Sequence, residues 1–87
     1  MAKISTGLQD CQHLTTVPVI SSFDRKGNIM PLYVGIEGEK VKIDTACLSS
    51  DSNHRILHFN CEATDGKIVR PIKLWYHIND MTWSIPR

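Results

Sequence analysis

The dipeptide Asp65-Gly66 stands between two runs, 55–64 and 67–78, in which apolar and polar residues alternate. Alternation with a period of two is typical of strands with one buried face. Asp-Gly is a strong hairpin signal because both residues accept a positive φ. A two-residue turn at this dipeptide makes Phe59 oppose Ile72. The sequence therefore predicts a hairpin with one apolar side.

A second two-residue turn is predicted at Asn79-Asp80, where both residues again tolerate a positive φ. This turn makes Tyr76 oppose Trp83, so a third strand continues the apolar side of the first hairpin. The residues predicted to share this side are Leu57, Phe59, Ile72, Leu74, Tyr76, Trp83 and Ile85.

Pro71 conflicts with this register, because the predicted pairing asks it for a backbone hydrogen bond that proline cannot donate. Proline inside a strand usually marks an edge or a bulge. We therefore expect a bulge or a sharp bend near Arg70-Pro71. A bend there also suits a sheet that curls into a barrel.

The first half of the chain contains three further predicted strands. Residues 17–23 form a short β-branched run with Pro18, which favours an edge strand. Residues 29–37 alternate, and Met30, Leu32, Val34 and Ile36 are predicted on one side. Gly38-Glu39 fits a two-residue turn into a strand over 40–47, which makes Met30 oppose Cys47.

The predicted fold is all-β, with about six antiparallel strands in sequential hairpins over residues 17–87. Each sheet has one apolar side, so the two halves must cover each other. A small SH3-like barrel is the first choice and a two-sheet sandwich is the alternative. Residues 1–16 are predicted as an N-terminal arm that is loosely ordered or holds a short helical turn between Leu8 and Leu14. A chain of 87 residues leaves room for one domain.

Composition excludes several functions. Ten Lys and Arg balance nine Asp and Glu without a polybasic run, which argues against binding driven by nucleic-acid phosphates. The sequence shows no secretory signal and no stretch that would span a bilayer. Three cysteines, an odd number without a spacing pattern, favour a reducing compartment, so a cytoplasmic protein is expected.

No catalytic, cofactor or metal site is predicted. The thiol and imidazole residues are Cys11, His13, Cys47, His54, His58 and Cys61. Their spacings do not match those of structural zinc sites. Strand alternation sends His58 and Cys61 to opposite sides, so they cannot ligate one ion together. We therefore expect a binding module rather than an enzyme.

The second side of the C-terminal strands is the candidate binding surface. Its predicted members are Ile56, His58, Lys73, Trp75 and His77, with Ile56 opposite Trp75 and His58 opposite Lys73. Aromatic and basic residues together are typical of interaction hot spots and of base-stacking platforms. The alternative is that residues 1–16 or the loop at 49–53 cover Trp75, which would make it part of the core.

A protein partner or self-association is the favoured function, with the Trp75 surface or the edge strand 17–23 as the contact. The alternative is single-stranded nucleic acid, with Trp75 stacking on a base and with Lys73, Arg55 and His58 nearby. Arg70 interrupts the apolar row, and its guanidinium is expected either to reach solvent or to hold an anion.

Overall fold

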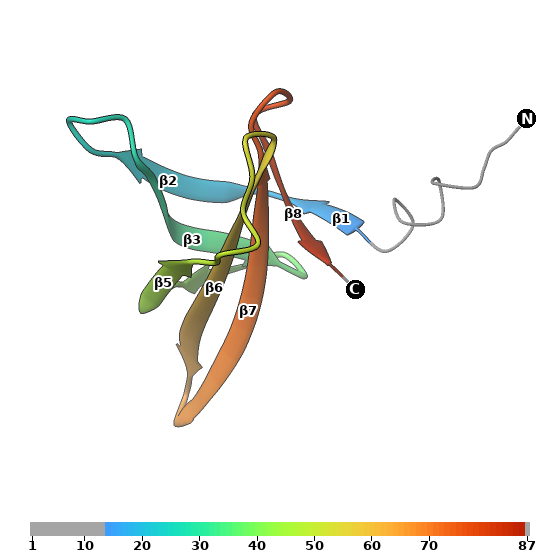
Figure 1. The fold of residues 1–87 in the computed structure, drawn as a ribbon. Helices are drawn as coiled ribbons and strands as arrows, with labels where there is room; N and C mark the ends of the chain where they lie inside the picture. The colour runs from blue at the N-terminus through green and yellow to red at the C-terminus, as the bar shows by residue number, and fades with distance from the viewer. Residues whose placement is uncertain (1–13, 87) are drawn as a thin grey trace, which may run out of the picture.

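A computed structural model describes residues 14–86, which form eight strands in two antiparallel sheets (Figure 1). The five-stranded sheet has the order β1-β8-β7-β6-β5, and the three-stranded sheet has the order β2-β3-β4. The strands of the larger sheet are β1 (Leu14–Val17), β5 (Thr45–Leu48), β6 (Ile56–Asp65), β7 (Ile68–His77) and β8 (Thr82–Pro86). Those of the smaller sheet are β2 (Val19–Phe23), β3 (Ile29–Ile36) and β4 (Glu39–Lys42). The all-β prediction is confirmed, and the two-sheet alternative agrees with this structure.

The end of the predicted N-terminal arm is a strand. Residues 14–16 belong to β1, where Leu14 pairs with Pro86 and Thr16 with Ser84. The helical turn proposed around Leu8 lies outside the described residues.

The chain passes between the sheets at Ile43-Asp44, where the sequence predicted one continuous strand. The Ile43 N–H donates to the Leu32 carbonyl of β3 at 2.9 Å, whereas the Asp44 N–H donates to the Glu62 carbonyl of β6 at 2.8 Å. Neighbouring residues therefore bond to different sheets. The predicted strand 40–47 is wrong for this reason, and Cys47 opposes Asn60 instead of Met30.

A second passage between the sheets occurs at Pro18, which separates β1 from β2. The Gly35 N–H of β3 donates to the Pro18 carbonyl at 2.9 Å. A Cβ atom placed on Gly35 would lie 2.7 Å from Pro18 Cγ, which is closer than real Cβ contacts come. The missing side chain of Gly35 therefore lets the two strands meet at this corner.

The central hairpin differs from the prediction by one residue on each strand. Its turn is Gly66-Lys67, with Gly66 at φ 67°, so Phe59 opposes Leu74 instead of Ile72. A positive φ at the first turn position alone is typical of a type II′ turn. Because the period of a strand is two, this displacement leaves every side chain on its predicted side.

No bulge accompanies Pro71, so the expected bulge is absent, and the sharp bend named as its alternative stays a prediction. The pairing of β6 with β7 is continuous, and Pro71 opposes Glu62. The Ile78 N–H donates to the Arg55 carbonyl at 2.9 Å, so the odd-numbered residues of β6 form the hydrogen-bonded pairs with β7. Glu62 is even-numbered, and its pair with Pro71 is therefore not hydrogen-bonded. The Pro71 nitrogen therefore faces away from β6. On its other side, β8 last pairs with β7 at Trp75, so no strand needs a donor from Pro71.

The register of β7 with β8 is as predicted, with Tyr76 opposite Trp83. The loop between them is longer than predicted, however, because it includes residues 78–81 rather than two residues. The Met81 N–H donates to the His77 carbonyl at 2.8 Å, and Met81 has the positive φ, 55°. A longer loop centred on the same point gives the same pairing.

The turn between β3 and β4 is Glu37-Gly38 instead of Gly38-Glu39. Both of its residues have a positive φ, 51° and 81°, as a type I′ turn requires. Val34 consequently opposes Val41, and both pack in the core.

A bulge in β3 reverses the predicted alternation in its first half. Ile20 pairs with Tyr33 and Ser21 with Pro31, so Leu32 is an extra residue. Met30 and Leu32, which were predicted on the apolar side, are 43% and 39% exposed. Pro31 is buried in their place, together with Ile29, while Val34 and Ile36 point inward as predicted.

The core lies between the two sheets. Its buried members are Ile29, Val34, Ile43, Phe59, Cys61, Ala63, Ile72, Leu74 and Trp83. The Trp83 ring lies 4.8 Å from the Tyr76 ring and 5.7 Å from the Phe59 ring, between centroids. All seven residues predicted on the apolar side belong to this core or pack against it, so that prediction is confirmed.

Candidate binding surface

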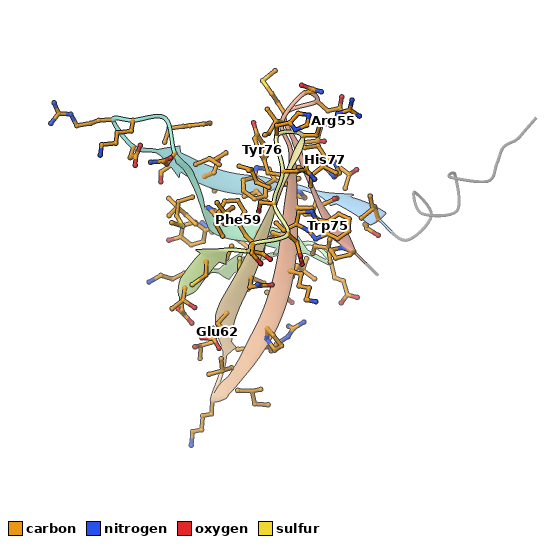
Figure 2. All side chains as sticks on the ribbon, in the orientation of Figure 1. Arg55, Phe59, Glu62, Trp75, Tyr76 and His77 are labelled. Carbon is orange, nitrogen blue, oxygen red and sulfur yellow. The ribbon has the colours of Figure 1, made fainter. Side chains whose placement is uncertain are left out.

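The five-stranded sheet has a second side that points away from the core, called here the outer face. Its residues are Leu14, Thr16, Thr45, Cys47, Ile56, His58, Asn60, Glu62, Thr64, Val69, Pro71, Lys73, Trp75, His77, Thr82, Ser84 and Pro86. Figure 2 shows Trp75 and Tyr76 extending to opposite sides of β7. Tyr76 packs against the core, so Trp75 is on the outer face, as the sequence predicted.

Trp75 and His58 form the centre of the outer face. They are direct partners across β6 and β7, and their ring centroids lie 4.5 Å apart with an angle of 47° between the ring planes. Both side chains are partly buried. The predicted partners were different, because the register moved by one residue on each strand: Ile56 opposes His77, and Lys73 opposes Asn60.

His77 is held in place by a neighbouring strand. Its Nε2 atom lies 2.7 Å from Ser84 Oγ, and Ser84 is only 3% exposed. Ser84 lies directly opposite Trp75 in β8, so this hydrogen bond lies beside the Trp75 ring. His77 bonds to no carboxylate within residues 14–86, so the pair lacks the acidic group that would complete a catalytic triad.

The loop at 49–53 contacts the backbone of β6. Ser52 Oγ accepts a hydrogen bond from the His58 N–H at 2.9 Å and lies 3.3 Å from the His58 carbonyl. This loop therefore supports the strand that carries His58. Three residues around Trp75 are exposed: Lys73 on the same strand, Asn60 on β6, and Thr16 on β1, on the far side of Ser84.

The two arginines considered in the sequence lie away from Trp75. Arg70 opposes Ala63 on the core side of the β6–β7 hairpin, and its guanidinium forms an exposed ion pair with Asp65 at 3.5 Å. Figure 2 shows Arg55 at the end of the sheet near the β7–β8 turn. The outer face thus brings together Ile56, His58, Lys73, Trp75 and His77 from the predicted set, without Arg70.

The two cysteines among the described residues lie on different sides of the larger sheet: exposed Cys47 opposes Asn60 of the outer face, whereas Cys61 is buried in the core. Burial, and to a smaller extent the nearby Cys47, raises the pKa of the Cys61 thiol to about 11. A thiol with this pKa is protonated near neutral pH and is a poor nucleophile. His58 and Cys61 lie on opposite sides of β6, as predicted. Within residues 14–86, no three His, Cys, Asp or Glu side chains gather as metal ligands do.

An apolar groove of about 480 Å³ opens between the two sheets, and the sequence did not predict it. It is lined mainly by Phe23, Ile29, Met30, Leu48, Leu57, Phe59, Tyr76 and Ile78. The groove exists because the chain leaves the smaller sheet after β4, so the first half of β3 has β2 as its neighbour on one side only. The alternation of apolar and polar residues does not indicate where the chain leaves the smaller sheet.

Comparisons with known proteins give no relative. No protein-family model matches the chain, and no significant match was found among curated proteins or solved structures. The part of the chain that the structure describes includes no helix with the length and apolar character needed to cross a membrane.

Proposed function

We propose that this chain is a small binding module without catalytic activity, which contacts another protein through Trp75 and His58 on the outer face. Self-association is the second form of the same proposal. The observation that carries it is the position of Trp75, on the side of the sheet opposite the core and beside exposed Thr16, Lys73 and Asn60. Tryptophan in such a position is enriched among residues that dominate protein interfaces.

The electrostatics of the outer face favour a protein over a nucleic acid. Lys73 is its single cation besides the histidines, and Glu62 on the same face carries the opposite charge. Single-stranded nucleic acid binds to positively charged grooves that follow its backbone. The formal net charge of the whole chain is only +1. A protein partner with a polar rim around an apolar contact suits this surface better.

The barrel form and the cytoplasmic location belong to the same proposal. The pairing of β1 with β8 supports a barrel, because it joins the first described strand to the last. The location follows from the three cysteines, and fractionation of source cells tests it.

Affinity capture from source cells tests the role of the outer face. The bait proteins are the wild type, Trp75→Ala, His58→Ala and the control Ile68→Ala, which removes an exposed apolar side chain beside the β6–β7 turn, away from Trp75 and from β2. We expect a partner that binds the wild type and the control but is lost with both outer-face variants. Circular dichroism confirms that each bait is folded. A partner retained equally by all four baits would contradict the proposal.

The nucleic-acid alternative is tested with the same variants. Fluorescence anisotropy with labelled single-stranded oligonucleotides at low salt measures the affinity directly. We expect no saturable binding. Tight binding that disappears with Trp75→Ala would replace the protein partner by a nucleic acid.

A further inference from the structure

Strand β2 forms an edge of the three-stranded sheet and pairs with β3 on one side only (Figure 1). The edge strand predicted over 17–23 is therefore correct for Val19–Phe23, whereas Val17 belongs to β1 of the other sheet. The sequence of β2, Val-Ile-Ser-Ser-Phe, contains neither a charged residue nor a proline. Edge strands in natural proteins are usually protected by charges, prolines or a covering segment, because their free backbone groups pair readily with other strands. Strand β2 has no charge or proline of its own to prevent such pairing.

The hydrogen bonds at the two ends of β2 show which of its backbone groups are free. The Asp24 N–H donates to the Asn28 carbonyl at 3.0 Å, and the Pro18 carbonyl accepts from Gly35 at 2.9 Å, so both end residues face β3. Bonding groups alternate in direction along a strand. Counting from either end gives the same result: the N–H and C=O groups of Val19, Ser21 and Phe23 point away from β3.

Two apolar side chains of β2 are exposed. Phe23 is 63% exposed and Ile20 is 53% exposed. Met30 and Leu32 lie on the neighbouring strand and are exposed by the bulge. Ile20 and Met30 lie on the side of this sheet away from the core, and Phe23 lies on the core side opposite Ile29, so apolar surface is exposed on both sides of the unpaired strand. Exposed apolar surface beside an unpaired strand is typical of interaction sites.

We infer that β2 pairs with β2 of a second copy of this chain, antiparallel about a twofold axis through Ser21. A twofold axis places the same patch on both subunits, so the patch must be self-complementary. With Ser21 on the axis, Ser21 opposes Ser21, and Val19 opposes Phe23 of the second copy. Val19, Ser21 and Phe23, whose backbone N–H and C=O groups point away from β3, then all fall in hydrogen-bonded pairs. This gives about six backbone hydrogen bonds between the two copies.

This register also suits the side chains. Phe23 meets Val19, an aromatic and β-branched pair of the kind that stabilises neighbouring strands. The small Ser21 side chains lie on the axis, where close approach is needed. Since β2 is uncharged, no like charges are opposed. The two three-stranded sheets become one six-stranded sheet, and the exposed Ile20 side chains gain apolar neighbours. Because these features make β2 self-complementary, we expect its partner to be β2 of a second copy rather than an unrelated strand.

The inference rests on the proposed function only in its self-association form, and it does not use Trp75. Light scattering during size-exclusion chromatography, over a wide range of concentrations, measures the dimer. We expect the wild type and Trp75→Ala to dimerise alike. A wild type that stays monomeric throughout would overturn the inference. Loss of the dimer with folded Trp75→Ala would also overturn it, because self-association would then use the outer face.

Charge variants test the register itself, because Ile20 opposes Ser22 of the second copy and both residues are exposed. We expect Ile20→Lys/Ser22→Lys to raise the dissociation constant of the dimer at least about tenfold, since it opposes like charges. We expect the same of Ile20→Glu/Ser22→Glu. Mixing these two variants restores association, because every opposed pair then has opposite charges.

A composition-matched control completes this test. The variant Ile20→Lys/Ser22→Glu opposes Lys to Glu within its own dimer, so we expect it to dimerise without a partner variant. If all the charge variants associate as the wild type does, β2 is not the interface. If the mixture stays monomeric while the composition-matched control dimerises, the register is wrong and the inference fails in this form.

A cysteine on the axis gives a second readout that does not depend on charge. Hydrogen-bonded antiparallel partners have Cα atoms about 5.5 Å apart, a distance that suits a disulfide. In a Cys11→Ser/Cys47→Ser background, we expect Ser21→Cys to form a covalent dimer under mild oxidation. Ser22→Cys serves as the control, because it opposes Ile20 of the second copy. Equal crosslinking of the two variants would contradict a twofold axis through Ser21.

Discussion

Substitution of Gly35 by alanine tests the corner at which the chain changes sheets. Replacing glycine by alanine in an unstrained conformation usually stabilises a protein by about 0.4–1 kcal/mol, because the unfolded chain loses freedom. At Gly35 we expect the opposite sign. The added Cβ would lie 2.7 Å from Pro18 Cγ, so the strands must move apart or the proline ring must shift. Overpacking of this kind costs about 1–3 kcal/mol, a large part of a total stability on the order of 5 kcal/mol.

Urea denaturation, followed by the fluorescence of buried Trp83, measures the change in the free energy of unfolding. The control is the same substitution in a Pro18→Ala background, where the colliding ring is absent. We expect Gly35→Ala to be neutral or stabilising there, which gives a coupling energy of about 1–3 kcal/mol between the two positions. The reasoning is refuted if Gly35→Ala stabilises the wild type, or if its cost is the same with and without the Pro18 ring.

Three further predictions concern the five-stranded sheet. Leu74→Ala, at a fully buried site, is expected to cost about 2.7–5 kcal/mol in urea denaturation, whereas Trp75→Ala on the outer face costs clearly less; equal costs would make the Trp75 ring part of the core. Pro71→Ala is expected to change stability by less than about 0.5 kcal/mol, and Arg70→Pro to cost about 3 kcal/mol because it removes a donor that faces β6; the reverse order would contradict the register. The pKa of Cys61 is raised by burial from 9.0 to about 11, so its contribution to stability is complete below pH 9 and is lost as the pH rises toward 11. Cys61→Ala should flatten this decline, and an unchanged pH profile would count against burial as its cause.

The sequence predicted the sides of the strands better than the turns between them. Two of the three predicted tight turns were misplaced by one position, yet the buried side was correct around both. A misplaced turn moved the partner of Phe59 from Ile72 to Leu74, and both of these side chains lie on the same side of β7. Periodicity fixes the side to which a residue points, whereas the turn fixes only its partner.

Two features could not be predicted because they depend on contacts between distant strands. The bulge at Leu32 forms where β2 and β3 lose their common register, although the residues of β3 alternate without interruption in the sequence. The passage at Ile43-Asp44 depends on acceptors in β3 and β6. Pro31, next to the bulge, was a local signal of a break, whereas Ile43-Asp44 contains neither glycine nor proline.

The candidate site was predicted in composition but not in arrangement. Alternation alone placed Trp75 and His58 on the outer face, but their direct contact follows from the true register. Arg70 was included because it interrupts an apolar row, and Asp65 at the turn is the partner that explains it. The edge strand was expected from Pro18, while the exposure of Met30 and Leu32 beside it depends on the bulge.

The pairing of β1 with β8 has a consequence for how the chain reaches this structure. Hairpins such as β6–β7 can form within about 1–10 μs, because their strands are adjacent in sequence. Leu14 meets Pro86 only after most of the chain has been made, and closing so long a loop is slow. During synthesis, Val17 cannot pair with Trp83 until the C-terminal strand has been made. We therefore expect the rate-limiting step of refolding to be more sensitive to substitutions in the β1–β8 pair than to substitutions in the β6–β7 hairpin.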